Sequence, residues 1–407
     1  MGQDRREPKE HKGICPMLHE VVFVHEFKFG MMPRIIFGAN SFQKLGEEAK
    51  KLQARKVLLV VDKKLCEMGL GEKALDILKR EKISAALFEQ GEAEPELEVA
   101  DKCTQFGKNN ACDFVIGIGG GSTLDTAKAA AVLMTNEGRA SEYQGFDKVR
   151  NPGLETIMVP TTAGTGSEVT PTAVFINREK GIKLGINSPY IFPTLALLDP
   201  ELTVSLPPNL TASTGMDALT HAVESYVAKA ASPITEMFSL KAFELLWTSL
   251  PIAVKEGGNI SARSKMLLGS SLAGIAITNA GTGASHAMSY ALSVLRKVPH
   301  GVSNGMLIPH VMEYNHESAV EKFVILAQKM GISVETLAPQ KAAFASCAKM
   351  VELTHEIGIP KHLKSFSITE PMISQLASMT MQLKGAIDNN PRLFTDETAV
   401  QIFRKVI

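Results

Sequence analysis

The sequence predicts two domains: an amino-terminal α/β domain built on a mainly parallel sheet, followed by an all-α domain. The chain has 407 residues, about twice the length that one simple core accommodates. Up to about residue 205, short apolar runs alternate with amphipathic stretches, and after it segments with helical periodicity dominate. The pair Pro207 and Pro208 marks this change. We therefore expect one domain over residues 1–205 and a second over residues 206–407.

Three β-branched runs in the first half predict buried strands: KVLLVV (56–61), DFVIGIG (113–119) and TIMVP (156–160). The segments GEKALDILKREK and ELEVADKCTQFGKNN, which lie between them, carry apolar residues at helical spacing. Repetition of strand, helix and strand favours parallel strands with helices on both faces of the sheet. Residues 1–27 precede this pattern and are expected to form a flexible lead or an extra strand.

In the second half, four long segments show apolar residues at spacings of three and four: SPITEMFSLKAFELLWTSLPIAVKEG, ARSKMLLGSSLAGIAI, ESAVEKFVILAQKMG and QKAAFASCAKMVELTHEIG. Strand-like runs are rare there. This pattern predicts that the second domain is entirely helical.

Composition restricts the class of partner. Forty-three basic and 43 acidic residues cancel, which removes the electrostatic argument for nucleic acid or a charged membrane surface. We expect no membrane span, because no apolar run reaches the roughly 18 residues that one requires. The five cysteines are scattered without a CxxC pair, which predicts neither disulfides nor a thiolate zinc site and favours the reducing cytoplasm. A small-molecule ligand is expected instead.

A glycine cluster follows the second predicted strand, in VIGIGGGSTLDTAKAAAVLM (115–134). Gly119, Gly120 and Gly121 would let the main chain approach a pyrophosphate, and the helix that follows offers N–H groups and a positive dipole end. Ser122 can add a hydroxyl donor. Because serine stands where the usual dinucleotide motif has its last glycine, a tight turn without a ligand is the alternative.

Asp62 ends the first predicted strand, where a carboxylate can accept hydrogen bonds from adenosine ribose and repel a 2′-phosphate. This position favours NAD over NADP. In the usual motif the acid follows the glycines by about 20 residues, whereas here it precedes them, so the predicted nucleotide-binding domain is a variant of the Rossmann fold. The alternative is that Asp62 only caps the next helix.

A hydroxyl-rich segment, PTTAGTGSEVTPTAVF (160–175), follows the third predicted strand. Thr161, Thr162 and Thr165 are candidates for a second wall of the nucleotide cleft, although a plain polar loop would have the same composition. Lys183 is a further candidate contact to a cofactor phosphate or ribose, although a lone lysine is usually solvated.

A candidate metal site begins in STGMDALTHAVESY (213–226), where Asp217 and His221 are one helical turn apart and face the same side. Such a pair is also common as an ordinary hydrogen-bonded pair. A second helical stretch and the loop after it, NAGTGASHAMSYALSVLRKVPHGVSNG (279–305), add His286 and His300. One carboxylate and three imidazoles suit Fe(II) or Zn(II) and leave a position open for substrate oxygen. Beside a nicotinamide, the resulting positive charge would favour hydride transfer between an alcohol and a carbonyl.

Five motifs, GGGSTLDTAK, PTTAGTGSEVT, GMDALTHAVESY, NAGTGASHAMSY and VPHGVSNGMLIPHVMEYN, occur in this order. Together they resemble the iron-containing, or group III, alcohol dehydrogenases over residues 28–407. The resemblance implies an active site between a nucleotide-binding α/β domain and a helical metal-binding domain, in an enzyme that commonly forms dimers or larger assemblies. It implies metal ligands at Asp217, His221, His286 and His300. It implies cofactor contacts at Asp62, Gly120, Gly121, Ser122, Asp125, Thr161, Thr162 and Lys183.

Two positions differ from the pattern of that family. Tyr290 stands where some members have a second histidine one turn after the third ligand, which makes its phenol the candidate proton relay. Glu94 precedes Pro95 where members often have asparagine.

The predicted function is an NAD(H)-dependent, metal-dependent alcohol dehydrogenase or aldehyde reductase for small primary alcohols or diols. One alternative is a hydroxyacid dehydrogenase or hydroxyacid–oxoacid transhydrogenase, for which Arg296 and Lys297 are the nearest candidate anchors of an acid group. Another is a lyase similar to dehydroquinate synthase, which would need several cationic side chains around a phosphate-bearing substrate. A nucleotide-binding module without catalysis would show no metal requirement.

Overall fold

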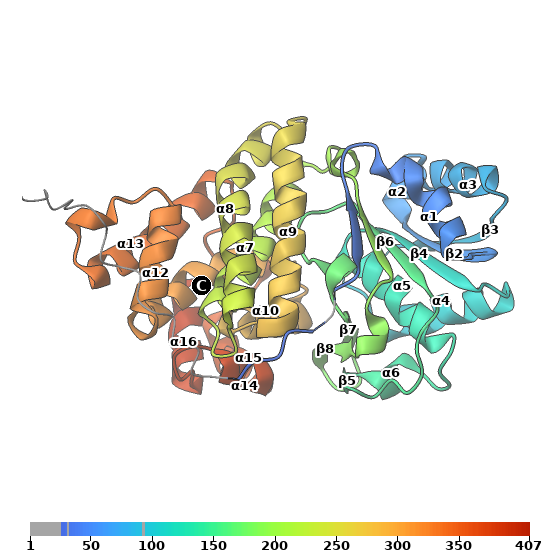
Figure 1. Ribbon diagram of the computed structural model, residues 1–407. Helices are drawn as coiled ribbons and strands as arrows, with labels where there is room; N and C mark the ends of the chain where they lie inside the picture. The colour runs from blue at the N-terminus through green and yellow to red at the C-terminus, as the bar shows by residue number, and fades with distance from the viewer. Residues whose placement is uncertain (1–25, 31, 92–93) are drawn as a thin grey trace, which may run out of the picture.

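The computed structural model describes residues 26–30, 32–91 and 94–407. Figure 1 shows an α/β half beside a helical half. The chain enters the helical half after β9 (Leu195–Leu198), the last strand of the α/β half. The expectation of a flexible lead or an extra strand over residues 1–27 falls almost wholly outside the described residues.

The α/β half is built on a six-stranded sheet in which every neighbouring pair is parallel. The strand order is β1-β9-β6-β4-β2-β3. The strands are β1 (Arg34–Phe37), β2 (Lys56–Asp62), β3 (Ser84–Gln90), β4 (Phe114–Gly119), β6 (Thr156–Pro160) and β9 (Leu195–Leu198). The predicted parallel sheet is confirmed, and β2, β4 and β6 coincide with the three predicted runs.

Alternate residues of each central strand point to opposite faces of this sheet. Val57, Leu59 and Val61 of β2 pack on the face covered by α1 (Leu45–Lys51) and α3 (Leu70–Arg80). Leu58 and Val60 pack on the other face, against α4 (Leu97–Asn109) and α5 (Gly121–Leu133). Burial on both faces explains why these strands are continuously apolar. The short helices α2 (Lys63–Glu67) and α6 (Ala140–Tyr143) complete this half.

A second, three-stranded sheet was not expected from the sequence. Its order is β5-β8-β7, with β7 (Thr172–Asn177) antiparallel to β8 (Ile182–Asn187) and β5 (Gly145–Phe146) parallel to β8. β8 also contacts α10 of the helical half. This small sheet therefore places residues of the first half beside the second.

The helical half contains ten α-helices among the described residues, as predicted for an all-α domain. They are α7 (Pro208–Val227), α8 (Pro233–Lys255), α9 (Ile260–Ala280), α10 (Ala284–Arg296), α11 (His300–Asn315), α12 (Val320–Lys329), α13 (Pro339–Glu356), α14 (Ile373–Met381), α15 (Lys384–Asn389) and α16 (Asp396–Lys405). They share one large apolar core, to which α7, α8, α10 and α11 all contribute.

Of the described helices, α8 alone is long and apolar enough to cross a membrane by length and composition, with a hydropathy of 1.3. Its Phe243, Leu246 and Leu250 are fully buried in the helical core. Figure 1 shows it lying alongside α7 and α9. This packing accounts for its buried apolar residues, while Met237 and Ile252 of the same helix are exposed.

The segment between β6 and β7 belongs to the α/β half and packs against the helical half. It includes the 3₁₀ helix η2 (Ser167–Val169), which packs against α9. The buried Glu168 accepts a hydrogen bond at Oε1 from Ser271 Oγ of α9, at 2.6 Å. Burial raises the pKa of Glu168. The hydroxyl-rich segment of the sequence is thus also a structural contact between the halves.

Candidate functional site

A cleft of about 2040 Å³ lies between the two halves and is lined by residues of both. Its α/β wall is formed by the loops at the carboxyl ends of β2, β4 and β6, which is where open parallel sheets bind ligands. Its helical wall is formed by α7, the end of α9, α10, the start of α11 and α15. Fourteen of the predicted site residues line this one cleft: Asp62, Gly120, Gly121, Ser122, Asp125, Thr161, Thr162, Thr165, Lys183, Asp217, His221, His286, Tyr290 and His300. Gly119 was also predicted, but it is buried at the end of β4 and is not part of the cleft lining.

The glycine loop joins the end of β4 directly to α5. Gly119 is the last residue of the strand, and Gly120 is the N-cap of the helix. Because Gly120 has no side chain, it makes no side-chain hydrogen bond to the first N–H groups of the helix. A Cβ atom on Gly121 would lie 2.6 Å from Thr165 Cγ2, so only glycine lets the two loops pack together. Thr161 N–H donates to the Gly119 carbonyl at 2.9 Å. The α/β wall therefore presents a helix amino terminus and a hydroxyl-lined loop, an arrangement that suits a phosphate.

The two predicted acidic contacts of this wall also have structural partners. Asp62 is the N-cap of α2, and its carboxylate accepts from Lys64 N–H at 2.9 Å. Asp125 accepts from Ser167 Oγ at 2.6 Å and from Val174 N–H at 2.9 Å. The capping role considered for Asp62 is thus present in the structure, and its side chain still lines the cleft.

Lys183 is not solvated, contrary to what is usual for a lone lysine. It lies on β8, is buried, and forms an ion pair with Glu94, with Nζ and Oε2 2.6 Å apart. Its Nζ also lies 5.1 Å from the centre of the Tyr290 ring on α10. The sequence did not indicate this environment, because the strand that buries Lys183 was not predicted.

On the helical wall, three helices bring one carboxylate and three imidazoles together. Asp217 and His221 lie one turn apart on α7, and His286 lies on α10. His300 is the first residue of α11 rather than part of a loop, because the helix begins directly after Pro299. A side chain on the next residue, Gly301, could not be accommodated, since its Cβ would lie 2.1 Å from the Ser213 carbonyl oxygen of α7. This close approach of α11 to α7 brings His300 to the cluster.

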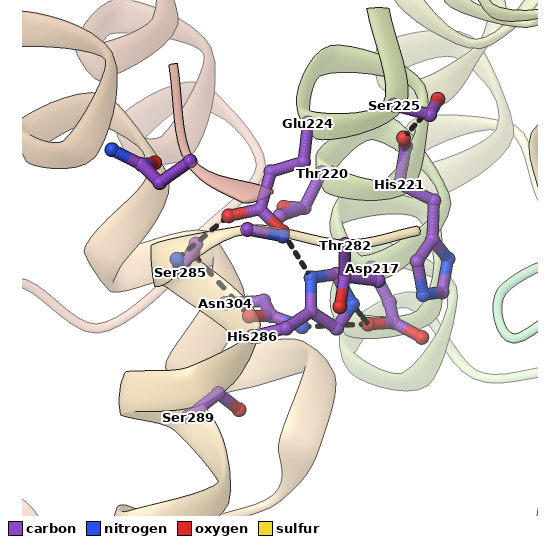
Figure 2. A network of polar contacts seen from close by, with 12 residues as sticks. Asp217, Thr220, His221, Glu224, Ser225, Thr282, Ser285, His286, Ser289 and Asn304 are labelled. Carbon is purple, nitrogen blue, oxygen red and sulfur yellow. Dashed lines mark hydrogen bonds and ion pairs between the residues drawn. The ribbon is translucent and has the colours of Figure 1, made fainter. Parts of the chain in front are cut away.

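Three of the four side chains have ligand atoms close enough to share one ion, and His300 lies beside them. Asp217, His221 and His286 each offer a ligand atom within 4.8 Å of the others. Asp217 Oδ1 lies 3.7 Å from His286 Nε2 and 3.4 Å from His300 Nε2. The rings of His221 and His286 are stacked with their centres 4.4 Å apart. Figure 2 shows the side chains of Asp217, His221 and His286 gathered between α7 and α10.

Two nitrogens of this cluster have no hydrogen-bond partner within the described part of the chain, although both are buried: His221 Nδ1 and His286 Nε2. A buried polar atom without a partner costs about 1–3 kcal/mol, so two side by side indicate that a group held here satisfies them. A metal ion is such a group, and the donor set of one carboxylate and three imidazoles fits Fe(II) or Zn(II).

The ionisation of the cluster also suits a cation. Burial by itself raises the pKa of Asp217, but the three imidazoles and the Asn304 amide outweigh it and lower the pKa to about 2. Burial lowers the pKa of His221 to about 4, and it lowers the pKa of His300 well below its usual value. At neutral pH the carboxylate is therefore charged and these imidazoles are neutral, which is the state that binds a metal.

Three residues that the sequence analysis did not select hold the cluster in place. Glu224 lies at 2.6 Å from His286 Nδ1 and also accepts from the N–H groups of Gly283 (2.8 Å) and Ser285 (2.6 Å). Figure 2 shows this carboxylate reaching from α7 to the start of α10. With Nδ1 donating to Glu224, His286 Nε2 presents its lone pair to the cluster. The signal was available, because Glu224 follows Asp217 by seven residues and shares its helix face.

The other two supports come from α10 and α11. Asn304 Nδ2 donates to Asp217 Oδ1 at 2.8 Å, and Ser289 Oγ lies 2.7 Å from His300 Nδ1. Asn304 was detectable as the residue one turn after His300. The side chain of Ser289 is fully buried in the helical half, and no local pattern in the sequence distinguishes it from other small core residues.

Tyr290 lies one turn after His286, with its ring centre 5.1 Å from that of His300. Burial raises the pKa of its phenol, and the negative charge of Asp217 raises it further. The phenol is therefore protonated at neutral pH, which makes it a hydrogen-bond donor in the cleft.

A large cleft with a helix start that suits a phosphate on one wall, and on the other a buried cluster of Asp217, His221, His286 and His300 that suits a metal ion, is typical of metal-dependent nucleotide enzymes. The cluster of these four residues is called the metal-ligand cluster below. Comparison with known proteins identifies the member of that class. The model of the iron-containing alcohol dehydrogenases matches residues 33–200, and that of the carboxy-terminal part of the Fe-containing alcohol dehydrogenase family matches residues 211–407. This chain belongs to the iron-containing alcohol dehydrogenase family.

Individual relatives agree with this assignment. The chain is 38% identical over 379 residues to 1,3-propanediol dehydrogenase of Klebsiella pneumoniae, covering 92% of this chain and 97% of the relative. A crystal structure of 1,3-propanediol oxidoreductase matches with a TM-score of 0.91 and 36% identity, over 94% of this chain and all of the other. Sulfoacetaldehyde reductase of Bifidobacterium kashiwanohense in complex with NAD⁺ matches with a TM-score of 0.85 and 31% identity, over 94% of this chain and 99% of the other. The protein is thus an iron-containing alcohol dehydrogenase with NAD as its second cofactor.

Proposed function

We propose that the chain interconverts small, uncharged primary alcohols or diols and their aldehydes, with the reaction taking place between Tyr290 and the Asp217, His221, His286 and His300 cluster. In this proposal the four residues of the cluster are the metal ligands. The observation that carries it is the pair of buried nitrogens on His221 and His286 that have no hydrogen-bond partner among the described residues, on two stacked rings whose centres are 4.4 Å apart. The name of the Klebsiella relative, which acts on 1,3-propanediol, supports the substrate class.

The cofactor would occupy the α/β wall. Gly119, Gly120, Gly121 and Ser122 would hold its pyrophosphate at the start of α5, and Thr161, Thr162 and Thr165 would line the opposite side. Asp62 would bind the adenosine ribose and disfavour a 2′-phosphate. Asp125 would position the loops through its contacts to Ser167 and Val174. Lys183 would lie at the nicotinamide end, since it contacts Tyr290.

A bound Fe(II) or Zn(II) would supply a Lewis acid that lowers the pKa of an alcohol and polarises an aldehyde. The protein's own groups do the rest. Glu224 and Ser289 fix the orientation of His286 and His300, and Asn304 fixes that of Asp217. Tyr290 lies close to His300 and is kept protonated by burial, so its phenol would donate a hydrogen bond to the substrate oxygen, and it is the candidate relay for the proton that a reduced substrate takes up.

Neither alternative function gains support from the cleft. Arg296 and Lys297, the candidate anchors for a hydroxyacid, are exposed at the carboxyl end of α10. No arginine lines the described part of the cleft, and of its five lysines four are exposed to solvent. The fifth, Lys183, is buried and paired with Glu94, so none is a buried, unpaired cation of the kind that a phosphate-bearing lyase substrate requires.

We also propose that the chain divides between residues 205 and 206, and that it acts in the cytoplasm as a homo-oligomer, most simply a homodimer. The last sheet strand ends at Leu198 and α7 begins at Pro208, which supports this boundary. The four described cysteines are free and buried, which suits a reducing compartment. β1 is an edge strand with exposed Ile35 and Phe37, and such edges favour pairing with another chain. Light scattering of the purified protein tests the oligomer.

The reaction is tested by anaerobic NADH oxidation with propanal, 3-hydroxypropanal and a set of oxoacids, using enzyme freed of metal and then reloaded with Fe(II) or Zn(II). We expect turnover of the uncharged aldehydes only after reloading, with about one ion bound per chain. Full activity of the metal-free enzyme, or turnover restricted to oxoacids, would contradict the proposal.

A further inference from the structure

One ion pair in the cleft joins Lys183, which the proposed function places at the nicotinamide end, to Glu94, an acid that has no part in the proposed function. Glu94 and Lys183 are 2.6 Å apart, and their side chains are only 19% and 9% exposed. Lys63, Lys64, Lys297 and Lys384 also line the cleft, but all four are exposed to solvent. Among the described residues of the cleft, Lys183 is therefore the cation whose charge is least screened by water.

The backbone holds the two partners together. The main chain beside Glu94 runs along β7, where Ile176 N–H donates to the Pro95 carbonyl at 2.9 Å and Glu96 forms an isolated parallel bridge to Ile176. Ile176 is in turn the antiparallel partner of Lys183 on β8. Glu94 thus lies directly before a segment that is bound to β7, and β7 separates that segment from Lys183 on β8. The main chain on both sides of the pair is therefore held by the small sheet.

The charge of Lys183 extends to the place where the substrate would react. Its Nζ lies 5.1 Å from the Tyr290 ring centre, and that ring lies 5.1 Å from the His300 ring centre. An unpaired Lys183 would therefore attract a carboxylate or sulfonate on the substrate, as a cation in a partly buried site does.

We propose that Glu94 is a specificity-determining residue, which neutralises Lys183 and so makes the enzyme prefer uncharged aldehydes and alcohols over those that carry an anionic group. This inference rests on the proposed function and names the feature that selects its substrate class. The carboxylate acts through Lys183 and has no part in the chemical step.

The test is the ratio of kcat/KM for 4-oxobutanoate to kcat/KM for pentanal, an uncharged aldehyde of similar length, measured at saturating NADH with the metal-loaded enzyme. The ratio cancels changes in cofactor or metal binding that affect both substrates. In Glu94→Gln, which keeps the shape of the side chain and removes its charge, we expect the ratio to rise on the order of tenfold. The rise should come mainly from a lower KM for 4-oxobutanoate.

Three further variants separate this effect from a structural one. Glu94→Gln combined with Lys183→Met leaves no charge at the pair and should restore the wild-type ratio. Lys183→Met alone leaves the carboxylate unpaired and should lower the ratio, which keeps the test informative if Glu94→Gln does not fold. Glu96→Gln is the matched control, because Glu96 lies two residues away and pairs with the half-exposed Arg178. Its ratio should equal that of the wild type.

An unchanged ratio in folded Glu94→Gln, or a raised ratio that persists in the double variant, would overturn the inference. Failure of the proposed function looks different. In that case the wild-type enzyme itself would turn over neither aldehyde.

Discussion

The two walls of the cleft are built in different ways. The α/β wall consists largely of main chain: a helix start, three glycines and a loop of threonines, packed so tightly that Gly121 cannot carry a side chain. The helical wall consists of side chains, in which Asp217, His286 and His300 are each held by a second residue. Cofactor binding at the main-chain wall should be weakened by an added side chain. Metal binding at the side-chain wall should be weakened by loss of a ligand's charge or of the contact that orients it. Substitutions on the two walls should therefore have separable effects.

The largest effect is expected from Asp217→Ala, which removes the one carboxylate of the metal-ligand cluster. We expect kcat/KM to fall about a thousandfold, equivalent to about 4 kcal/mol of transition-state stabilisation, together with loss of bound metal. NADH affinity, measured by fluorescence titration, should change little because the α/β wall is intact. Asp76→Ala, on the exposed face of α3, is the control and should behave as wild type. Retention of metal and activity by Asp217→Ala would show that the cluster is not the metal site.

Glu224→Gln tests how far metal binding at the helical wall depends on the orientation of His286. Glutamine has one acceptor oxygen in place of two, so it cannot accept from two main-chain N–H groups and also orient His286. We expect metal affinity to fall about 10–100-fold, as for other partners of metal-binding histidines, while NADH affinity stays unchanged. Glu236→Gln on α8 removes a charge from a partly exposed pair with Lys322 of α12 and should leave metal affinity unaltered. Equal metal affinity in wild type and Glu224→Gln would show that Glu224 does not orient His286 for metal binding.

Gly121→Ala examines the opposite wall. The added methyl group would meet Thr165, and overpacking of this kind costs about 1–3 kcal/mol. We expect NADH to bind about tenfold more weakly, which corresponds to about 1.4 kcal/mol, with normal metal content. Gly258→Ala adds the same group where nothing lies within 4 Å and serves as the matched control. Loss of metal in Gly121→Ala would mean that the two walls are not separable.

The smallest effect is expected at Asp62, which caps α2 and also lines the cleft. Asp62→Asn keeps a good N-cap but removes the negative charge that disfavours a 2′-phosphate. We expect kcat/KM for NADPH relative to NADH to rise about fivefold without loss of stability. Asp62→Ala should in addition lower the free energy of unfolding by about 1 kcal/mol. An unchanged cofactor preference in Asp62→Asn would leave helix capping as the only role of this residue.

Features of the site that lie within a few residues of one another were open to prediction. The strand, glycine loop and helix of the α/β wall follow one another directly, and Asp217 and His221 are separated by a single helical turn. Both patterns reflect local backbone geometry, which needs no knowledge of the fold. His286 and His300 were candidates because of their residue type and the family resemblance, and no spacing rule links them to α7.

The hairpin of β7 and β8 was missed because TAVFIN and IKLGIN are short and lie beside a polar loop. With it the burial of Lys183 and its pairing with Glu94 were missed, since those residues are 89 positions apart. The contact between Glu224 and His286 was missed for the same reason, because the two residues are 62 positions apart. Such contacts depend on how strands and helices pack, and packing is decided by the whole core.

The sequence by itself determined the parallel sheet, the helical second half, the glycine loop at the end of β4, and the placement of Asp217 and His221 on one helix face. These follow from periodicity and from the chemistry of neighbouring residues. Only the tertiary structure decided which nitrogens of the histidines face the cluster, which residues orient them, and which acid neutralises Lys183. These depend on the approach of α11 to α7, of α7 to α10, and of β8 to the chain before α4, because a hydrogen bond or ion pair requires its two partners to be held within about 3 Å of each other.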